Sequence, residues 1–293
     1  MRIIFLALAA LVVAAPAAHA SAADAPTKTV KVGAQTVGYR SVGQGRPIVM
    51  IMGLSGTMDA WPPSFIDALA ATGHRVILFD NEAIGRTSAL PGNLTIARMA
   101  DTTAGLIAAL KLDKPDVMGW SMGGMIAQSF AVRHPASLRR LVLMATAPGD
   151  GKAKLPRPDA FSALQSASDA SALLGLLFPA GHAEEQTRYI LDITSRKVGF
   201  APSASKEVVG RQLAATTRWI TGQDPDGARI TSLKMPVIAA GAVKDWALPA
   251  DNTRHLAAVI PGAKRLMYSD AAHGFFIQVV DRFVPRVAKF LRP

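Results

Sequence analysis

Short, continuous apolar runs alternate with longer amphipathic stretches along most of this chain. Six apolar runs end in turn residues, at 48–52, 75–79, 116–118, 141–145, 236–240 and 265–268. Runs of this kind are typical of strands that are buried on both faces of a parallel sheet. Ahead of them, residues 30–32 and 36–40 alternate apolar and polar positions around a glycine turn. This alternation predicts an antiparallel hairpin at the start of the sheet.

Helical patterns fill the intervals between these runs. They cover residues 61–71, 96–110, 122–133, 249–260 and 276–291. Strand and helix in alternation predict an α/β fold, with a mostly parallel open sheet and helices on both of its faces.

One interval, 148–233, departs from this rhythm because it contains no strand run. Its Ala- and Leu-rich helical stretches lie at 162–178, 183–195 and 205–220, separated by turns with Pro and Gly. We expect a helical cap over the carboxyl edge of the sheet, inserted into a core made of 21–147 and 234–293. A separate second domain is the alternative, although apolar helix stripes need a surface that covers them.

The first twenty residues have the pattern of a secretory signal peptide. Arg2 is followed by an apolar stretch at 3–13, and Ala18-His19-Ala20 supplies a cleavage site of small residues. The stretch is shorter than the roughly 20 residues that a membrane-spanning helix needs. We expect export to the periplasm or the medium, with no stable membrane anchor after cleavage. A cut after Ala22 and a retained N-terminal anchor are the alternatives.

Composition narrows the class of protein further. Of the 293 residues, 50% are hydrophobic, which excludes an intrinsically disordered chain. The absence of cysteine excludes disulfides and Cys nucleophiles. The net charge of +11 would suit an acidic partner, but the basic residues are dispersed, so no nucleic-acid partner is expected. Without metal-ligand spacing or a phosphate-binding loop, the sequence predicts no metal and no cofactor.

The most informative motif is Gly119-Trp120-Ser121-Met122-Gly123-Gly124, between an apolar run and a helical pattern. Gly-x-Ser-x-Gly in this setting predicts a tight strand-to-helix turn that exposes the serine. A serine hydroxyl needs a nearby base and donors for the oxyanion before it can act as a nucleophile. We therefore predict Ser121 as the nucleophile. The free backbone N–H of Met122, at the helix start, is one expected oxyanion donor.

A second loop follows the first parallel strand, with the sequence Met52-Gly53-Leu54-Ser55-Gly56. Its glycines allow the backbone to approach a substrate, and the N–H of Leu54 is the second expected oxyanion donor. A plain Gly-rich connection is the alternative.

With these segments the chain resembles the α/β-hydrolase superfamily over nearly its whole length after residue 20. Ile51-Met52-Gly53-Leu54, Trp61-Pro62, Phe79-Asp80-Asn81 and the Ser121 motif are similar to those of a bacterial serine-esterase and haloperoxidase-like branch. Many relatives have His where Met52 stands; since a backbone amide is the donor, the change leaves that role intact. Serine at 121, where related dehalogenases and epoxide hydrolases have aspartate, favours acyl-transfer chemistry.

Elimination identifies the general base. Of the six histidines, only His273 follows the last strand and lies at the carboxyl edge, where a loop can bring it to Ser121. The order of nucleophile, acid and histidine that the resemblance implies agrees with this choice. His273 is therefore the predicted base.

Two aspartates are candidates for the acid that orients His273. Asp245 lies in a segment after the run 236–240 that resembles the family's Gly-x-x-Asp…Pro, with one extra residue between Gly and Asp. Asp150, after the run 141–145, occupies the other place that some relatives use. Asp245 is the predicted acid and Asp150 the alternative.

These residues predict an exported serine hydrolase that cleaves a carboxylic ester or lactone through an acyl-serine, without a cofactor. Its partner would be a small apolar ester or a related acyl substrate, and Met52, Trp61, Trp120 and Trp246 are candidate pocket residues. Three alternatives stay open: a perhydrolase or haloperoxidase on the same triad, a hydrolase of C–C bonds, and a receptor-like protein with little turnover.

Overall fold

The computed structural model describes residues 21–160, 170–197 and 199–292. The predicted signal peptide at 1–20 and the first part of the cap helix predicted at 162–178 lie outside these residues.

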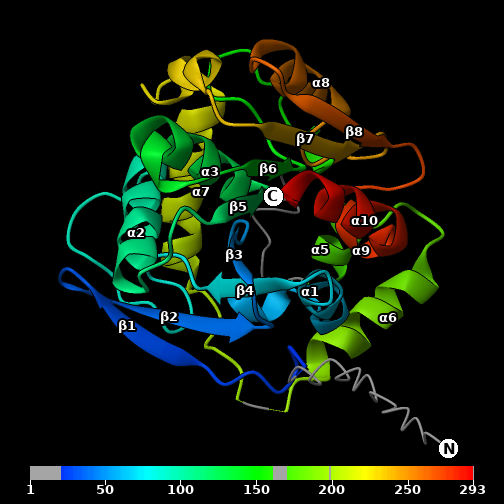
Figure 1. Cartoon of the computed structure of the whole chain (residues 1–293). Helices are drawn as coiled ribbons and strands as arrows, with labels where there is room; N and C mark the ends of the chain where they lie inside the picture. Colours follow the sequence, from blue (N-terminus) through cyan, green and yellow to red (C-terminus); the bar gives the residue numbers. More distant parts are fainter. Residues whose placement is uncertain (1–20, 161–169, 198, 293) are drawn as a thin grey trace, which may run out of the picture.

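In the described part of the chain, eight strands form one sheet in the order β1-β2-β4-β3-β5-β6-β7-β8 (Figure 1). The strands are β1 (Lys28–Val32), β2 (Gln35–Val42), β3 (Arg46–Ile51), β4 (His74–Phe79), β5 (Asp116–Trp120), β6 (Leu141–Met144), β7 (Val237–Ala242) and β8 (Lys264–Tyr268). The β1–β2 and β2–β4 pairs are antiparallel, and the other pairs are parallel. The predicted fold class is confirmed.

The helices cover both faces of this sheet. They are α1 (Pro63–Ala70), α2 (Ile96–Ala109), α3 (Met122–Arg133), α5 (Ala170–Leu177), α6 (Ala183–Thr194), α7 (Lys206–Ile220), α8 (Ala250–Val259), α9 (Phe275–Gln278) and α10 (Val280–Leu291). The prediction of a single last helix at 276–291 is wrong in one respect. Val279, with φ −125° and ψ 37°, leaves the helical conformation, and the chain divides there into α9 and α10.

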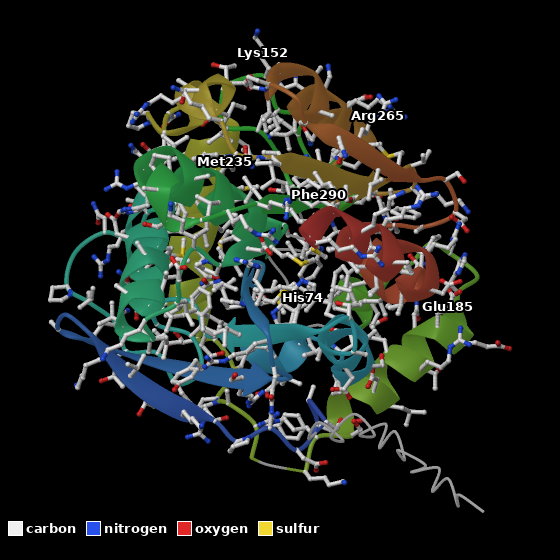
Figure 2. The ribbon with its side chains drawn as sticks, viewed as in Figure 1. His74, Lys152, Glu185, Met235, Arg265 and Phe290 are labelled. Carbon is white, nitrogen blue, oxygen red and sulfur yellow. The ribbon has the colours of Figure 1, made fainter. Side chains whose placement is uncertain are left out.

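Strand β3 shows how the sheet separates two cores. Successive side chains of a strand point to opposite faces. Val49 and Ile51 accordingly pack into the core under α2 and α3, while Ile48 and Met50 pack into the core under α1 and α10. Side chains fill the space between sheet and helices on both faces (Figure 2). An apolar run of this length is buried throughout because both faces are covered.

Between β6 and β7 the described residues include the helices α5, α6 and α7. Helix α7 packs against α2 and α3, and α6 packs against α1 (Figure 1). Trp219 of α7 is fully buried and donates its Nε1–H to the carbonyl of Ala147, at 3.1 Å. This contact fixes α7 against the end of β6. The boundaries 148–233 of the cap stay a prediction.

Candidate active site

Ser121 occupies the turn between β5 and α3 with a strained backbone. Its φ of 57° and ψ of −124° lie in a region that side-chain-bearing residues rarely adopt. Two hydrogen bonds hold this conformation: the N–H of Ser121 donates to Met144 O at 2.9 Å, and the hydroxyl of Thr146 donates to Ser121 O at 2.7 Å. Such strain is found where a side chain must be presented to a substrate.

The glycines on either side of Ser121 are required by close backbone approaches. A Cβ at Gly119 would lie 2.3 Å from the carbonyl oxygen of Gly123, and one at Gly123 would lie 2.1 Å from that of Ile51. No side chain fits at either position without moving the backbone. The motif is therefore a steric requirement of this strand-to-helix turn.

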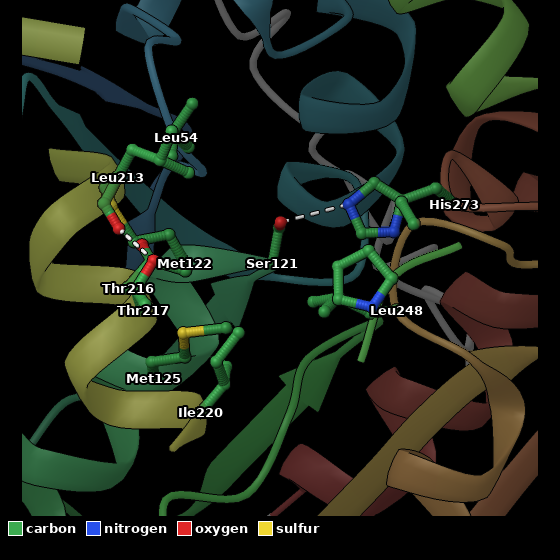
Figure 3. A pocket seen from close by; sticks show the side chains of 12 residues that line it. Leu54, Ser121, Met122, Met125, Leu213, Thr216, Thr217, Ile220, Leu248 and His273 are labelled. Carbon is green, nitrogen blue, oxygen red and sulfur yellow. Dashed lines mark hydrogen bonds between the residues drawn. The ribbon is translucent and has the colours of Figure 1, made fainter. Parts of the chain in front are cut away.

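The structure brings Ser121, His273 and Asp245 into one hydrogen-bonded chain. His273 Nε2 lies 3.0 Å from Ser121 Oγ (Figure 3). On the other side of the ring, His273 Nδ1 lies 2.9 Å from Asp245 Oδ2. An ionised carboxylate only accepts hydrogen bonds, so this arrangement places the ring proton of neutral His273 on Nδ1 and leaves Nε2 to accept the serine proton. The three residues follow β5, β8 and β7 at the carboxyl edge of the sheet.

Neighbouring groups hold His273 and Asp245 in place. His273 is 4% exposed and Asp245 is 5% exposed. Trp120 Nε1 donates to the carbonyl oxygen of His273 at 3.0 Å, and the N–H of Leu248 donates to Asp245 Oδ1 at 2.8 Å. The imidazole and the carboxylate thus have little freedom to move apart.

Asp150, the alternative acid, has a different partner. Its Oδ2 lies 2.6 Å from Nε2 of His255, on α8. Of the two candidate acids, only Asp245 contacts His273 among the described residues. His74, at the start of β4 (Figure 2), is buried far from this edge, with its Nδ1 2.8 Å from the hydroxyl of Thr72.

The loop that carries Leu54 is fixed from two sides. Asn81 Nδ2 donates to Met52 O at 2.8 Å. On the other side, Gln212 of α7 accepts the N–H of Ser55 with its Oε1, also at 2.8 Å. The role of Gln212 could not be predicted from the sequence, because a contact across 157 residues leaves no signal in local spacing.

Asp80 orders the connection after β4. Its carboxylate accepts the N–H of Met58 at 2.8 Å and the N–H of Arg86 at 2.9 Å. Burial raises the pKa of Asp80, although the two N–H donors lower it in part. The residue is fully buried and does not line the cavity beside Ser121, so its contribution is structural.

A narrow, mostly apolar cavity opens beside Ser121 (Figure 3). Its volume is about 30 Å³. The walls are made of Leu54, Met122, Met125, Pro156, Leu213, Thr216, Thr217, Ile220, Ala247 and Leu248, with Ser121 and His273. Leu54 and Met122, the expected oxyanion donors, both border it. The N–H groups in the first turn of a helix have no intrahelical partner, so Met122 has an amide available for a ligand.

The four candidate pocket residues do not line this cavity. Met52 and Trp61 are buried in the core on the α1 and α10 side of the sheet. Trp120 packs against Trp61 and Phe276 in the same layer. Trp246 points to an outer groove instead, where Arg157 lies over its ring at 4.8 Å. The interpretation is wrong because nearness to a motif in sequence does not determine the face to which a side chain points.

Helix α7 supplies the wall that the sequence did not assign. The residues of α7 that border the cavity are Leu213, Thr216, Thr217 and Ile220, which lie on one side of the helix, as expected for spacings of three and four.

Within the described residues, no group of three or more His, Asp or Glu side chains is arranged to hold a metal ion. In the part of the chain that the structure describes, no helix is both long and apolar enough to cross a bilayer.

Comparison with known proteins shows similarity over nearly the whole described chain. A family model described as alpha/beta hydrolase fold matches residues 46–278. The chain is 32% identical to a putative non-heme bromoperoxidase of Mycobacterium tuberculosis, over 81% of this chain and 91% of that protein. It is 27% identical to rhodomycin D methylesterase of Streptomyces sp. (strain C5), over 91% of this chain and 98% of the relative.

A solved structure has the same fold as this chain. An alpha/beta hydrolase fold protein from Chitinophaga pinensis superposes with a TM-score of 0.83 at 28% identity, covering 92% of this chain and 98% of the other.

Proposed function

The chain belongs to the α/β-hydrolase fold family, and we propose that it is a serine hydrolase that cleaves a carboxylic ester or lactone through an acyl-serine intermediate. One observation carries the proposal: the hydrogen-bonded chain from Ser121 through His273 to Asp245, with distances of 3.0 Å and 2.9 Å. Nucleophile, base and orienting acid within hydrogen-bond reach are the arrangement that acyl transfer requires.

Acylation begins when Ser121 Oγ attacks the carbonyl carbon of the substrate. His273 Nε2 takes the serine proton as the C–O bond forms, and Asp245 stabilises the resulting imidazolium through Nδ1–H. The substrate's carbonyl oxygen becomes an oxyanion, which the N–H groups of Leu54 and Met122 hold. Removal of one such donor costs about 10²–10³ in kcat in enzymes where it has been measured.

Collapse of this intermediate releases the alcohol. The imidazolium of His273 returns its proton to the leaving oxygen, and the acyl group stays on Ser121 as an ester. A water molecule then attacks the acyl carbon and gives its proton to His273. The acyl–oxygen bond then breaks, His273 returns the proton to Ser121 Oγ, and the carboxylic acid leaves. In a lactone the alcohol and the acid remain parts of one product.

The shape of the cavity favours a small substrate group. The walls are predominantly apolar, and the space of about 30 Å³ is narrow. An apolar wall binds an acyl chain by removing it from water. A short acyl chain is therefore the expected occupant.

A panel of chromogenic esters and lactones of increasing chain length tests the proposal. The wild type should hydrolyse short-chain members, and Ser121→Ala should lose turnover of all of them. Equal rates for the two proteins would overturn the assignment of Ser121. Matched unfolding curves for the two proteins would show that the variant folds.

A second activity is favoured by the relative described as a putative non-heme bromoperoxidase. In this reaction hydrogen peroxide, not water, attacks the acyl-serine, and a peroxy acid leaves. Bromination in the presence of acetate and peroxide, absent from Ser121→Ala, would establish it. The C–C hydrolase alternative uses the same triad and stays open, since another relative is described as a 2-hydroxymuconate semialdehyde hydrolase. The receptor-like alternative is not favoured by an intact triad.

We also propose that the protein is exported, with cleavage after Ala20. The residues that follow this position are held against the fold: the hydroxyl of Ser21 and the N–H of Ala22 both donate to Asp67, at 2.7 Å each. A cut after Ala22 would remove both contacts. N-terminal sequencing of protein recovered outside the cytoplasm should begin at Ser21, and recovery of the full chain in the cytoplasm alone would contradict export.

A further inference from the structure

Two threonines of α7, Thr216 and Thr217, border the cavity beside Ser121, and their hydroxyl groups differ in their hydrogen bonds. The hydroxyl of Thr217 donates to the carbonyl of Leu213, one turn earlier, at 2.9 Å. Thr221 makes the same kind of bond with the carbonyl of Thr217, at 2.8 Å. A threonine in a helix commonly satisfies its hydroxyl in this way.

Thr216 does not follow this pattern. Its Oγ1 is buried and has no hydrogen-bond partner among the described residues. A buried polar group without a partner is unfavourable, and in native proteins such groups usually have an explanation in function or in bound solvent. Thr216 therefore offers an unused donor in a mostly apolar wall.

The position of this donor is well fixed. Gln212, one turn before Thr216, is fully buried and accepts the N–H of Ser55 at 2.8 Å. One turn after it, Trp219 donates to Ala147 O at 3.1 Å. These two bonds tie α7 to the loops that follow β3 and β6. A donor on a rigid element can select a ligand by the position of its acceptor.

Thr216 and His273 lie on opposite sides of Ser121 (Figure 3). The leaving alcohol must face His273, which returns a proton to it. The acyl chain extends away from the leaving group, toward α7. Thr216 therefore lies on the side of Ser121 where the acyl part of the substrate is expected.

We propose that Thr216 is a specificity-determining residue that donates a hydrogen bond to an oxygen atom on the acyl chain. This inference rests on the proposed function. The favoured substrates are esters or lactones whose short acyl part carries an ether, keto or hydroxyl oxygen, and plain alkyl acyl groups leave the donor unpaired. A site that is built to pair with a substrate oxygen discriminates against an analogue without it.

Matched pairs of 4-nitrophenyl esters test this inference. Butanoate is compared with methoxyacetate, and pentanoate with 3-methoxypropanoate, so that an ether oxygen replaces a methylene group of similar size. Each ester is assayed with wild type and with Thr216→Val, which removes the hydroxyl and keeps the branched shape. Comparing the two proteins cancels differences in the intrinsic reactivity of the esters.

In at least one pair, Thr216→Val should lower kcat/KM for the ether ester about 10-fold more than for the alkyl ester, as expected for one lost hydrogen bond. Thr216→Ser should keep the preference of the wild type. Thr221→Val, whose hydroxyl is bonded to the carbonyl of Thr217 and which does not border the cavity, should leave the ratio within each pair unchanged. Equal losses for both members of both pairs with Thr216→Val would overturn the inference.

Failure of the proposed function gives a different result, namely no ester turnover by the wild type. Binding is then measured with Ser121→Ala by the shift in its unfolding temperature with methoxyacetate, butanoate and the two longer acids. A larger shift for an ether acid, lost in Ser121→Ala/Thr216→Val, supports the role of Thr216 without turnover. Equal shifts within both pairs would overturn it.

Discussion

Gln212 of α7 accepts the backbone N–H of Ser55, the residue after Leu54, at 2.8 Å. The side chain is fully buried, and the contact joins a helix between β6 and β7 to the loop after β3. Because Leu54 is the expected oxyanion donor in that loop, the position of α7 and the geometry of the oxyanion site are coupled through one hydrogen bond.

Replacement of Gln212 by Met should lower kcat about 10-fold, since the loss of one buried hydrogen bond misplaces the loop. KM should change little, because the cavity walls stay in place. Arg211→Met is the matched control: it removes a side chain of the same helix that donates to Gly92 O at 2.7 Å, away from the loop. A rise in KM without a change in kcat would contradict a positioning role for Gln212.

Asp245→Asn should reduce kcat for esters by about 10³–10⁴, the size of the effect when the acid of such a triad is changed to an amide. The amide can donate to Nδ1, which favours the wrong tautomer of His273. Asp150→Asn changes a carboxylate that contacts His255 and accepts the N–H of Lys152, and neither partner belongs to the triad. Its activity should stay within about 3-fold of the wild type. If the two variants exchanged these effects, Asp150 would be the acid.

Trp120→Phe keeps an aromatic ring in the layer with Trp61 and Phe276 but removes the N–H that donates to His273 O. We expect kcat to fall by roughly 3- to 10-fold, the range for one hydrogen bond. The preference for acyl-chain length should not change, because Trp120 does not line the cavity. A changed chain-length preference would show that Trp120 does contact the acyl chain of the substrate.

The burial of His74 predicts that the free energy of unfolding falls in mild acid. Burial lowers the pKa of His74, and the nearby Asp116 raises it in part. The unfolded chain therefore binds a proton at His74 more readily than the folded chain, and the free energy of unfolding falls as the pH drops through the ordinary pKa of about 6.5. Urea unfolding between about pH 7.5 and about pH 5.5 should show a smaller decrease for His74→Gln than for the wild type. An equal decrease in the free energy of unfolding for the two proteins would show that His74 does not cause the loss.

Much of this fold follows from the sequence because its signals are local. The apolar runs and the Gly-Trp-Ser-Met-Gly-Gly turn at 119–124 predict strand, helix and the exposed Ser121 from neighbouring residues alone. The position of His273 after the last strand also follows, since parallel strands bring their carboxyl ends to one edge.

What could not be predicted depends on contacts between distant segments. Trp61 and Met52 adjoin the motifs in sequence but lie in the core on the other face of the sheet. Conversely, Gln212 and Thr216 belong to a helix with no catalytic motif, and its packing over α3 brings them to the site.

Labelling with a fluorophosphonate probe, mapped by mass spectrometry, shows whether Ser121 is a nucleophile activated by His273. We expect one labelled residue, Ser121, in the wild type, with no labelling of Ser121→Ala and strongly slowed labelling of His273→Ala. Labelling of Ser121 at the same rate with and without His273, or equal labelling of wild type and Ser121→Ala, would contradict this role of Ser121.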